Sequence, residues 1–418
     1  MSWRRGNDVL WLVSLAAAGL TLWCVTRTAL LGLQAVWLDI VFVLIIGLGE
    51  VLRVRTPGGA SGSAPMSLAA GAGLALLAGS YHGGRPAPPV CEAVTVVAAG
   101  MVLGSLVFAL GRREALTARM PLRLVSVAVA GEVFHLVAGL GRHGHLFARP
   151  DHWWVVATLG AAALIGVLYL VLAALTGGSA RASVRTRLLD ELDGSALVCA
   201  AAVATASVIA IGSWDLGVWS AIIFSIPMLV TTGALRRYAV IRQTQAQTVR
   251  ALSRAAEVAG YIEVGHSDRV ADLSVRIGEV LGLRSRRLNE LRSAALMHDI
   301  GQLSLREPIP GGATLLATGP QRVDIARRGA QVLERAAVLP AVARIMAEQA
   351  VPYCELADDS PVRTEAGVVA VANAYDDLVG AEPSFQRQAQ ALERLRLGAG
   401  SQYDPAVVEA LEQVLVHG

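Results

Sequence analysis

The sequence contains no lysine, and all 36 of its basic residues are arginine. Charged residues make up only 17% of the 418 residues, against about 25% in an ordinary soluble domain. Hydrophobic residues make up 54%, a balance that indicates a membrane protein. The formal net charge is only +3, so we expect no nucleic-acid polymer as a partner.

Cysteine is scarce as well. The four cysteines, at positions 24, 91, 199 and 354, show no paired spacing typical of a disulfide framework or a zinc site. The first apolar run is not followed by a small-residue cleavage pattern. We therefore predict that this run is a retained membrane anchor rather than a signal peptide.

Long apolar runs dominate the chain before residue 236. A helix that spans a bilayer needs about 20 apolar residues, and eight runs approach this length, the third and seventh being the shortest. The pattern predicts a polytopic helix bundle whose partner is the lipid bilayer. The predicted spans are 9–26, 30–52, 65–81, 89–111, 121–141, 153–176, 195–213 and 216–235.

The arginines are distributed unevenly between the segments that connect these spans. With the N-terminus inside, thirteen arginines lie in inside segments, and only Arg27, Arg85, Arg142 and Arg149 lie in outside loops. Arginine and lysine concentrate on the cytoplasmic side of membrane proteins. We therefore predict a multi-pass protein of a bacterial inner (plasma) membrane, with both termini in the cytoplasm.

Several ionisable residues fall at membrane depth, where they are costly and often functional. Glu50 and Glu92 lie near predicted span ends, where they can reach water. Glu132 and His135 are three residues apart on one helix face, and Asp39 can join them. These three residues form either a ligand, proton or metal site in the bundle or a polar clamp between helices.

The chain divides by composition into a membrane domain (1–235), a connecting helix (236–258) and a domain of residues 259–418. Apolar residues recur at steps of three and four along the connecting helix, at Val249, Leu252, Ala256 and Ala259. This spacing is typical of a short coiled coil, which would join a homodimer, or of a simple spacer helix.

The last domain shows helical periodicity almost throughout and little strand-like alternation. The fold class is therefore all-α: a bundle of about eight spans followed by a cytoplasmic all-helical domain. The predicted helices of this domain are 269–281, 288–300, 323–333, 338–349, 364–379, 386–396 and 405–416.

Two segments of this domain carry metal-binding chemistry. The first, Gly-His-Ser-Asp-Arg-Val-Ala at 265–271, contains His266, and the second, Ala-Ala-Leu-Met-His-Asp-Ile-Gly at 294–301, contains His298 and Asp299 on a predicted helix. An adjacent His-Asp pair with a second histidine supplies two imidazoles and a carboxylate to a divalent metal. Such a metal lowers the pKa of a water molecule and polarises a phosphoryl oxygen.

These segments resemble those of the HD superfamily, and within it the HD-GYP family of cyclic di-GMP phosphodiesterases. Val-Ala-Asn-Ala-Tyr-Asp-Asp-Leu at 371–378 resembles a late helix of that family. Gly-Ser-Gln-Tyr-Asp-Pro-Ala-Val-Val at 400–408 resembles its C-terminal segment. The resemblance covers residues 255–416. It implies His266, His298 and Asp299 as metal ligands and Asp299 as a catalytic residue.

The sequence also departs from the HD-GYP pattern. Gln302 stands where the family has a phosphate-binding lysine, and Ile325 stands where it has a histidine. The paired histidines of the family align with Glu348 and Gln349, and its late aspartate aligns with Asn373. The Gly-Tyr-Pro loop is absent. Glu348, Asn373 and Asp376 remain as candidates to complete the ligand set. Gln302 remains as a second candidate catalytic residue, which can still donate a hydrogen bond to a phosphate.

We therefore expect at most one divalent metal site, for Mn, Fe or Mg. Two functions remain open for the domain. One is a membrane-anchored phosphohydrolase acting on cyclic di-GMP or another nucleotide second messenger. The other is a catalytically inactive sensor or scaffold that binds a nucleotide or a partner protein under the control of the membrane region. A transporter is disfavoured, because no inverted repeat is evident.

Overall fold

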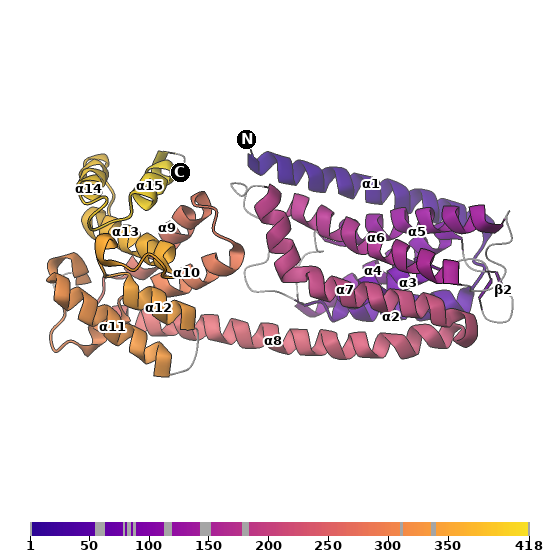
Figure 1. The fold of residues 1–418 in the computed structure, drawn as a ribbon. Coiled ribbons are helices and arrows are strands. Elements are labelled where there is room, and N and C mark those ends of the chain that lie inside the picture. Colours follow the sequence, from indigo (N-terminus) through magenta and orange to yellow (C-terminus); the bar gives the residue numbers. More distant parts are fainter. Residues whose placement is uncertain are drawn as a thin grey trace. The chain divides into compact units, whose positions relative to one another are not determined.

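The computed structural model describes residues 2–54, 63–77, 80–81, 85–86, 89–112, 119–142, 152–177, 184–309, 312–335 and 340–416. Almost all described elements are helices, which confirms the all-α fold class (Figure 1). The chain forms two compact units that divide between Ile241 and Arg242. The predicted membrane domain lies within the first unit, and the predicted helical domain lies within the second.

The first unit is a bundle of apolar helices with one short hairpin. The strands β1 and β2 pair antiparallel, with Ser80 opposite Pro86. The elements of this unit are α1 (Ser2–Leu31), α2 (Val36–Val51), α3 (Pro65–Ala75), β1 (Ser80–Tyr81), β2 (Arg85–Pro86), α4 (Val90–Arg112), α5 (Met120–Arg142), α6 (His152–Thr176), α7 (Val184–Leu216) and the first part of α8 (Val218–Val258).

Among the described residues, six helices are long and apolar enough to cross a membrane: α1, α4, α5, α6, α7 and α8. Large apolar side chains cover their outer faces, including Trp11, Leu30 and Leu197. Such extensive exposed apolar surface is unfavourable in water and indicates contact with lipid. The chain is therefore a membrane protein by the length, composition and exposed surface of its helices.

Two of the eight predicted spans form shorter helices. The second, α2, has 16 residues, and the third, α3, has 11. At 1.5 Å per residue they rise about 24 and about 16 Å, less than the roughly 30 Å of a hydrocarbon core. Every residue of α3 is buried, because the neighbouring helices α2, α4, α5 and α7 surround it. The apolar pattern at 65–77 therefore reflects burial within protein.

A buried charge cluster joins α2, α4 and α5. Glu50 is fully buried, and its two carboxylate oxygens lie 3.0 Å from Arg53 Nη2 and 2.8 Å from Arg123 Nη2. Arg53 also donates to Ser105 Oγ at 2.7 Å. The expectation that Glu50 reaches water was wrong, since two arginines compensate its charge inside the bundle.

The three predicted polar residues of the bundle differ in their surroundings. Asp39 is buried on α2, and its carboxyl group interacts with that of Glu92, which is not one of the three. Glu132 lines a cavity between α1, α4 and α5. His135 packs edge-on against Phe134, with ring centroids 5.9 Å apart. Their grouping into one ligand site stays a prediction.

The helix α8 is continuous from Val218 to Val258, so the last predicted span and the predicted connecting helix form one element. Within the second unit, Val249 and Ala256 are buried, while Leu252 is 36% exposed and Ala259 is exposed. Two of the four residues of the predicted dimer stripe are thus already covered by their own chain. Dimerisation through this helix stays a prediction.

The second unit is a helical domain with a continuous apolar core. Its helices match the seven predicted from periodicity, with ends shifted by a few residues. The elements are α9 (His266–Val280), α10 (Ser285–Met297), η2 (Ile300–Ser304), η4 (Thr314–Leu316), α11 (Gly319–Arg335), α12 (Pro340–Glu348), η5 (Tyr353–Glu355), α13 (Arg363–Val379), α14 (Phe385–Leu397) and α15 (Pro405–Val416). The core lies between α9, α10, α12, α13 and α15.

Candidate metal centre

Three segments of the second unit bring the predicted metal ligands together. His266 is the first residue of α9, where Gly265 turns the chain with a φ of 80°, a conformation that favours glycine. His298 and Asp299 were expected on a helix, but α10 ends at Met297 and the pair lies in the turn before η2. Because the turn leaves helical geometry, both neighbouring side chains can face the same point.

The ligand atoms of these three residues lie close together and are buried. The Nε2 atoms of His266 and His298 are 3.4 Å apart. The Oδ2 atom of Asp299 lies 3.7 Å from the first and 3.3 Å from the second. Helix α13 adds the amide oxygen of Asn373, 3.1 Å from His298 Nε2. Two nitrogens and two oxygens therefore converge on one point.

The partners of the far ring atoms assign the tautomers of both histidines. His266 Nδ1 lies 2.7 Å from Asp376 Oδ2, and His298 Nδ1 lies 2.8 Å from the carbonyl oxygen of Ala295. Both partners only accept hydrogen bonds, so each Nδ1 carries the proton. In the neutral rings, the two Nε2 atoms are therefore lone-pair acceptors that face the oxygens of Asp299 and Asn373.

Four acceptors at this spacing repel one another unless a cation lies between them. Asp299 Oδ2 is buried and, within the described part of the chain, has no hydrogen-bond partner. Burying such a carboxylate oxygen unpaired costs free energy. A divalent ion among these atoms would remove both costs, so the residues present fit one metal ion.

Without a metal ion, the negative charge of Asp299 favours an extra proton on His298. Burial alone lowers the pKa of His298, but the charge of Asp299 outweighs it and raises the pKa to about 9. Burial alone raises the pKa of Asp299, but the neighbouring His298 and His266 hold that pKa below its usual range. The ionised carboxylate of Asp299 therefore favours a positive charge at this site.

A second layer of contacts fixes the ligand side chains. Asp376 accepts from His266 and from Arg269, whose Nη2 lies 2.8 Å from its Oδ2. Asn373 Nδ2 donates to Thr314 Oγ1 at 3.0 Å, which directs the amide oxygen towards His298. Such outer partners orient metal ligands and set their basicity. Asp376, a candidate ligand in the sequence, therefore lies one layer outside the converging atoms.

Three other predicted residues lie beside the site with different partners. The side-chain amide of Gln302 donates a hydrogen bond to the carbonyl oxygen of Gly312 at 3.0 Å. This contact stabilises the backbone just before η4. Glu348 accepts from Ser360 Oγ at 2.5 Å, and Gln349 donates to the backbone carbonyl of His298 at 3.3 Å. These contacts hold the surrounding backbone.

A small cavity opens beside Asp299 and Asn373. Its volume is about 40 Å³, and Ile325 lies in its wall, where the HD-GYP family has a metal-binding histidine. Arg322 of α11 and Tyr403 also line it. The Nε atom of Arg322 is buried without a hydrogen-bond partner among the described residues. Among the described residues that line this cavity, Arg322 is the basic one.

Arg269, Thr314 and Arg322 also belong to the site, although the sequence motifs did not identify them. Arg269 follows His266 by three residues on α9, and Asp376 follows Asn373 by three on α13. Residues at this spacing share a helix face, so this pattern could have identified the pair. Thr314 and Arg322 come from other elements, and no local spacing connects them to the ligands.

Residues 264–377 match the family model of the HD domain. This range includes all four converging residues, Asp376 and Arg322. Neither the curated proteins nor the solved structures contain a match to the chain. The second unit of this membrane protein therefore contains an HD domain, and this match supports the HD superfamily.

Proposed function

We propose that this chain is a membrane-anchored phosphohydrolase that uses one divalent metal ion to cleave a phosphoester bond of a nucleotide. The convergence of four buried acceptor atoms, from His266, His298, Asp299 and Asn373, is the observation that supports this function. A structural polar cluster of a helical core would satisfy its acceptors with donors. Here, in the neutral rings, the Nδ1 protons of both imidazoles point away from the shared centre, and both Nε2 atoms face it as acceptors.

The residues around the site would have different roles in binding the metal and the phosphate. A divalent ion bound there would act as a Lewis acid on a phosphoryl oxygen and lower the pKa of a water molecule. Asp376 and Arg269 hold His266 in its tautomer, and Thr314 holds the Asn373 oxygen. In the HD-GYP family, a lysine at the position of Gln302 attracts the phosphate charge. In this chain, Arg322 would take over that role. The mixed nitrogen and oxygen set suits Mn²⁺ or Fe²⁺ better than Mg²⁺.

A single metal site follows from the neighbouring residues. Ile325 offers no ligand atom, Glu348 is engaged by Ser360, and Gln349 is engaged by the backbone of His298. We propose cyclic di-GMP as the first substrate to test, since the domain resembles the HD-GYP family. The cavity of about 40 Å³ is far smaller than a dinucleotide, so its walls must open for that substrate, and a smaller phosphoester fits with less movement.

A second candidate is a catalytically inactive domain that binds a nucleotide or a partner protein. The narrow cavity and the neutral Gln302 favour it, because both weaken binding of a charged phosphodiester. The cellular setting is the same for both candidates. The arginine distribution supports a bacterial inner membrane with both termini cytoplasmic, where nucleotide messengers are present.

The test uses the full chain purified in detergent. Bound metal is measured by mass spectrometry of the elements. Hydrolysis of cyclic di-GMP and of nucleotide monoesters is assayed with Mn²⁺, Fe²⁺ or Mg²⁺. His298→Ala should remove both metal and turnover, while His152→Ala, a change of an exposed histidine in the first unit, should leave both unchanged.

The outcomes separate the two candidates. Stoichiometric metal with turnover that His298→Ala abolishes supports the enzyme. Stoichiometric metal with nucleotide binding but no turnover of any tested phosphoester supports the inactive module. A protein that binds neither metal nor nucleotide contradicts the enzyme and the nucleotide-binding form of the inactive module.

A further inference from the structure

Two cysteines far apart in the sequence meet inside the first unit. Cys24 lies on α1 and Cys91 is the second residue of α4, and their sulfur atoms are 3.2 Å apart although 67 residues separate them. Both are free thiols. A disulfide bond measures about 2.0 Å, so an approach of about 1 Å would join them.

The packing of the two helices maintains this proximity. One turn further along each helix, the hydroxyl oxygens of Thr28 and Thr95 are also 3.2 Å apart. Thr95 is held in place because its hydroxyl donates to the carbonyl oxygen of Cys91 at 2.8 Å. Two small polar pairs on the same faces show that α1 and α4 approach closely here. The sulfur contact is thus part of a close interface between the two helices.

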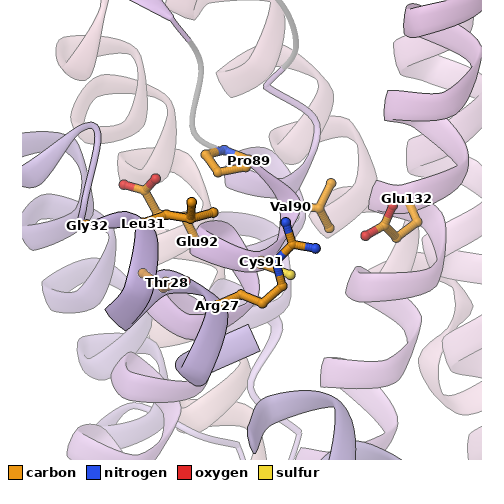
Figure 2. A pocket seen from close by; sticks show the side chains of 9 residues that line it. All are labelled: Arg27, Thr28, Leu31, Gly32, Pro89, Val90, Cys91, Glu92 and Glu132. Atoms are coloured by element: carbon orange, nitrogen blue, oxygen red, sulfur yellow. The ribbon is translucent and has the colours of Figure 1, made fainter. Parts of the chain in front are cut away.

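The two thiols differ in access. Cys91 is partly exposed and lines a cavity of about 180 Å³, whereas Cys24 is only 2% exposed and lies behind it. Figure 2 shows the guanidinium of Arg27 beside the Cys91 sulfur, with the carboxylate of Glu132 facing it across the cavity. The guanidinium of Arg27 is thus placed where it can stabilise the negative charge of a sulfur atom during thiol exchange. The cavity therefore presents one attacking thiol with a second thiol directly behind it.

We propose that Cys24 and Cys91 form a redox-active pair that closes to a reversible disulfide by exchange with an external disulfide. The Cys91 thiolate attacks a sulfur of the oxidant, and one thiolate leaves with the electrons of the broken bond. Cys24 loses its proton to solvent and attacks Cys91 in the mixed disulfide, which releases the second thiolate. Both released thiolates take up the protons that the cysteines lost, so one external disulfide becomes two thiols.

The membrane topology supplies a suitable environment for this exchange. The arginine distribution predicts that the end of α1 and the start of α4 lie on the non-cytoplasmic side. Disulfides form and persist on that side of a bacterial membrane and are rare in the cytosol. Closure would join α1 covalently to α4 and so fix one helix of the bundle against another. It would make the membrane unit responsive to redox conditions independently of any activity of the HD domain.

The experiment uses the full chain in detergent with Cys199→Ser and Cys354→Ser, which leaves only this pair of the four cysteines. The reduced protein is treated with hydroxyethyl disulfide, a small neutral oxidant, then denatured and labelled with a maleimide polymer. Two labels should attach before oxidation, none after it, and two again after dithiothreitol. Mass spectrometry should show the loss of two hydrogens without an adduct, in a single chain.

Single variants test the order of attack. Cys24→Ser should accumulate a stable hydroxyethyl adduct on Cys91, whereas Cys91→Ser should leave Cys24 modified several-fold more slowly. Arg27→Gln should slow the adduct formation several-fold, and Arg27→Lys should retain it. Two thiols that still label after oxidation, adducts on both cysteines without an internal bond, or a bond between two chains would each overturn the proposal.

Discussion

The Nδ1 atom of His266 lies 2.7 Å from the Oδ2 atom of Asp376, which comes 110 residues later in the chain. This contact fixes the proton of His266 on the side away from the metal centre. Arg269 shares the same carboxylate and compensates its charge. Burial alone raises the pKa of Asp376, but the hydrogen bonds from His266 and Arg269 hold that pKa below its usual range. The carboxylate therefore stays ionised and orients the ring.

Replacing Asp376 by alanine should weaken metal binding although no candidate ligand is lost. The loss of such an outer partner typically costs about 10–100-fold in metal affinity. The dissociation constant for Mn²⁺, measured by titration calorimetry on the full chain, should rise by that factor. Asp268→Ala is the matched control, because Asp268 is an exposed aspartate on α9. Equal affinities for the two variants would show that Asp376 does not orient His266.

A substitution of Asn373 should strengthen metal binding rather than weaken it. The change Asn373→Asp places a full negative charge at 3.1 Å from His298 Nε2, where the sequence pattern of the family has an aspartate. The hydroxyl of Thr314 can donate to the new carboxylate in place of accepting from the amide. We expect metal affinity to rise at least about tenfold, since charged ligands bind divalent ions more tightly than amide oxygens.

The control for this change is Asn289→Asp, which adds the same charge at an exposed position of α10. Its metal affinity should equal that of the unaltered chain. A lower affinity for Asn373→Asp than for Asn289→Asp would mean that Asn373 is not directed at the metal. The same pair of variants, assayed for turnover, shows whether the missing carboxylate limits activity.

The sequence predicted most of the helical domain because each helix has a periodic apolar face. It also predicted the three candidate ligands that the structure brings together, since His266 and the His298–Asp299 pair lie in local motifs. The exact course of the chain at the ligands was less predictable: the end of α10 at Met297 depends on the close contact between η2 and α11. The outer role of Asp376 depends on the packing of α13 against α9, which no local pattern specifies.

The membrane region illustrates the same limit. Apolar composition alone does not distinguish a helix in lipid from one buried in protein, so α3 was predicted as a span although it has 11 residues. The contact between Cys24 and Cys91 was equally inaccessible, because it results from the approach of two helices. Spacing along the sequence reports on one helix at a time.

Metal affinity should depend on pH through His298. In the metal-free protein, the pKa of about 9 means that this ring keeps its extra proton throughout the neutral range. A metal ion must displace that proton, so affinity should rise by about tenfold for each pH unit and level off above pH 9. Mn²⁺ affinity measured from pH 6.5 to 9 under anaerobic conditions checks this slope, which is roughly one proton per metal.

The variant Asp299→Asn is informative about the cause of this slope. Removing the charge that raises the pKa of His298 should lower the pH above which the metal affinity becomes constant. The metal affinity itself should fall at every pH, because a charged ligand is lost. An affinity that does not change between pH 7 and 9 in the unaltered chain would contradict the protonation of His298.

The close contact behind the ligand turn should control both stability and metal binding. A Cβ atom on Gly301 would lie 1.9 Å from the carbonyl oxygen of Ile325 and 2.9 Å from the backbone nitrogen of Gly329. Both neighbours belong to the backbone of α11, so they cannot rotate away. Gly301→Ala should therefore push η2 off α11, at a cost of about 1–3 kcal/mol or more for overpacking.

Thermal unfolding of the full chain, followed by the loss of metal from the HD domain, measures this effect. Gly301→Ala should unfold at a temperature lower by several degrees and should bind metal more weakly, because Asp299 is only two residues away. Gly319→Ala is the matched control, since nothing lies within 4 Å of its Cβ position. It should leave both quantities nearly unchanged. If the two variants behave alike, the turn is free to shift and does not set the ligand geometry.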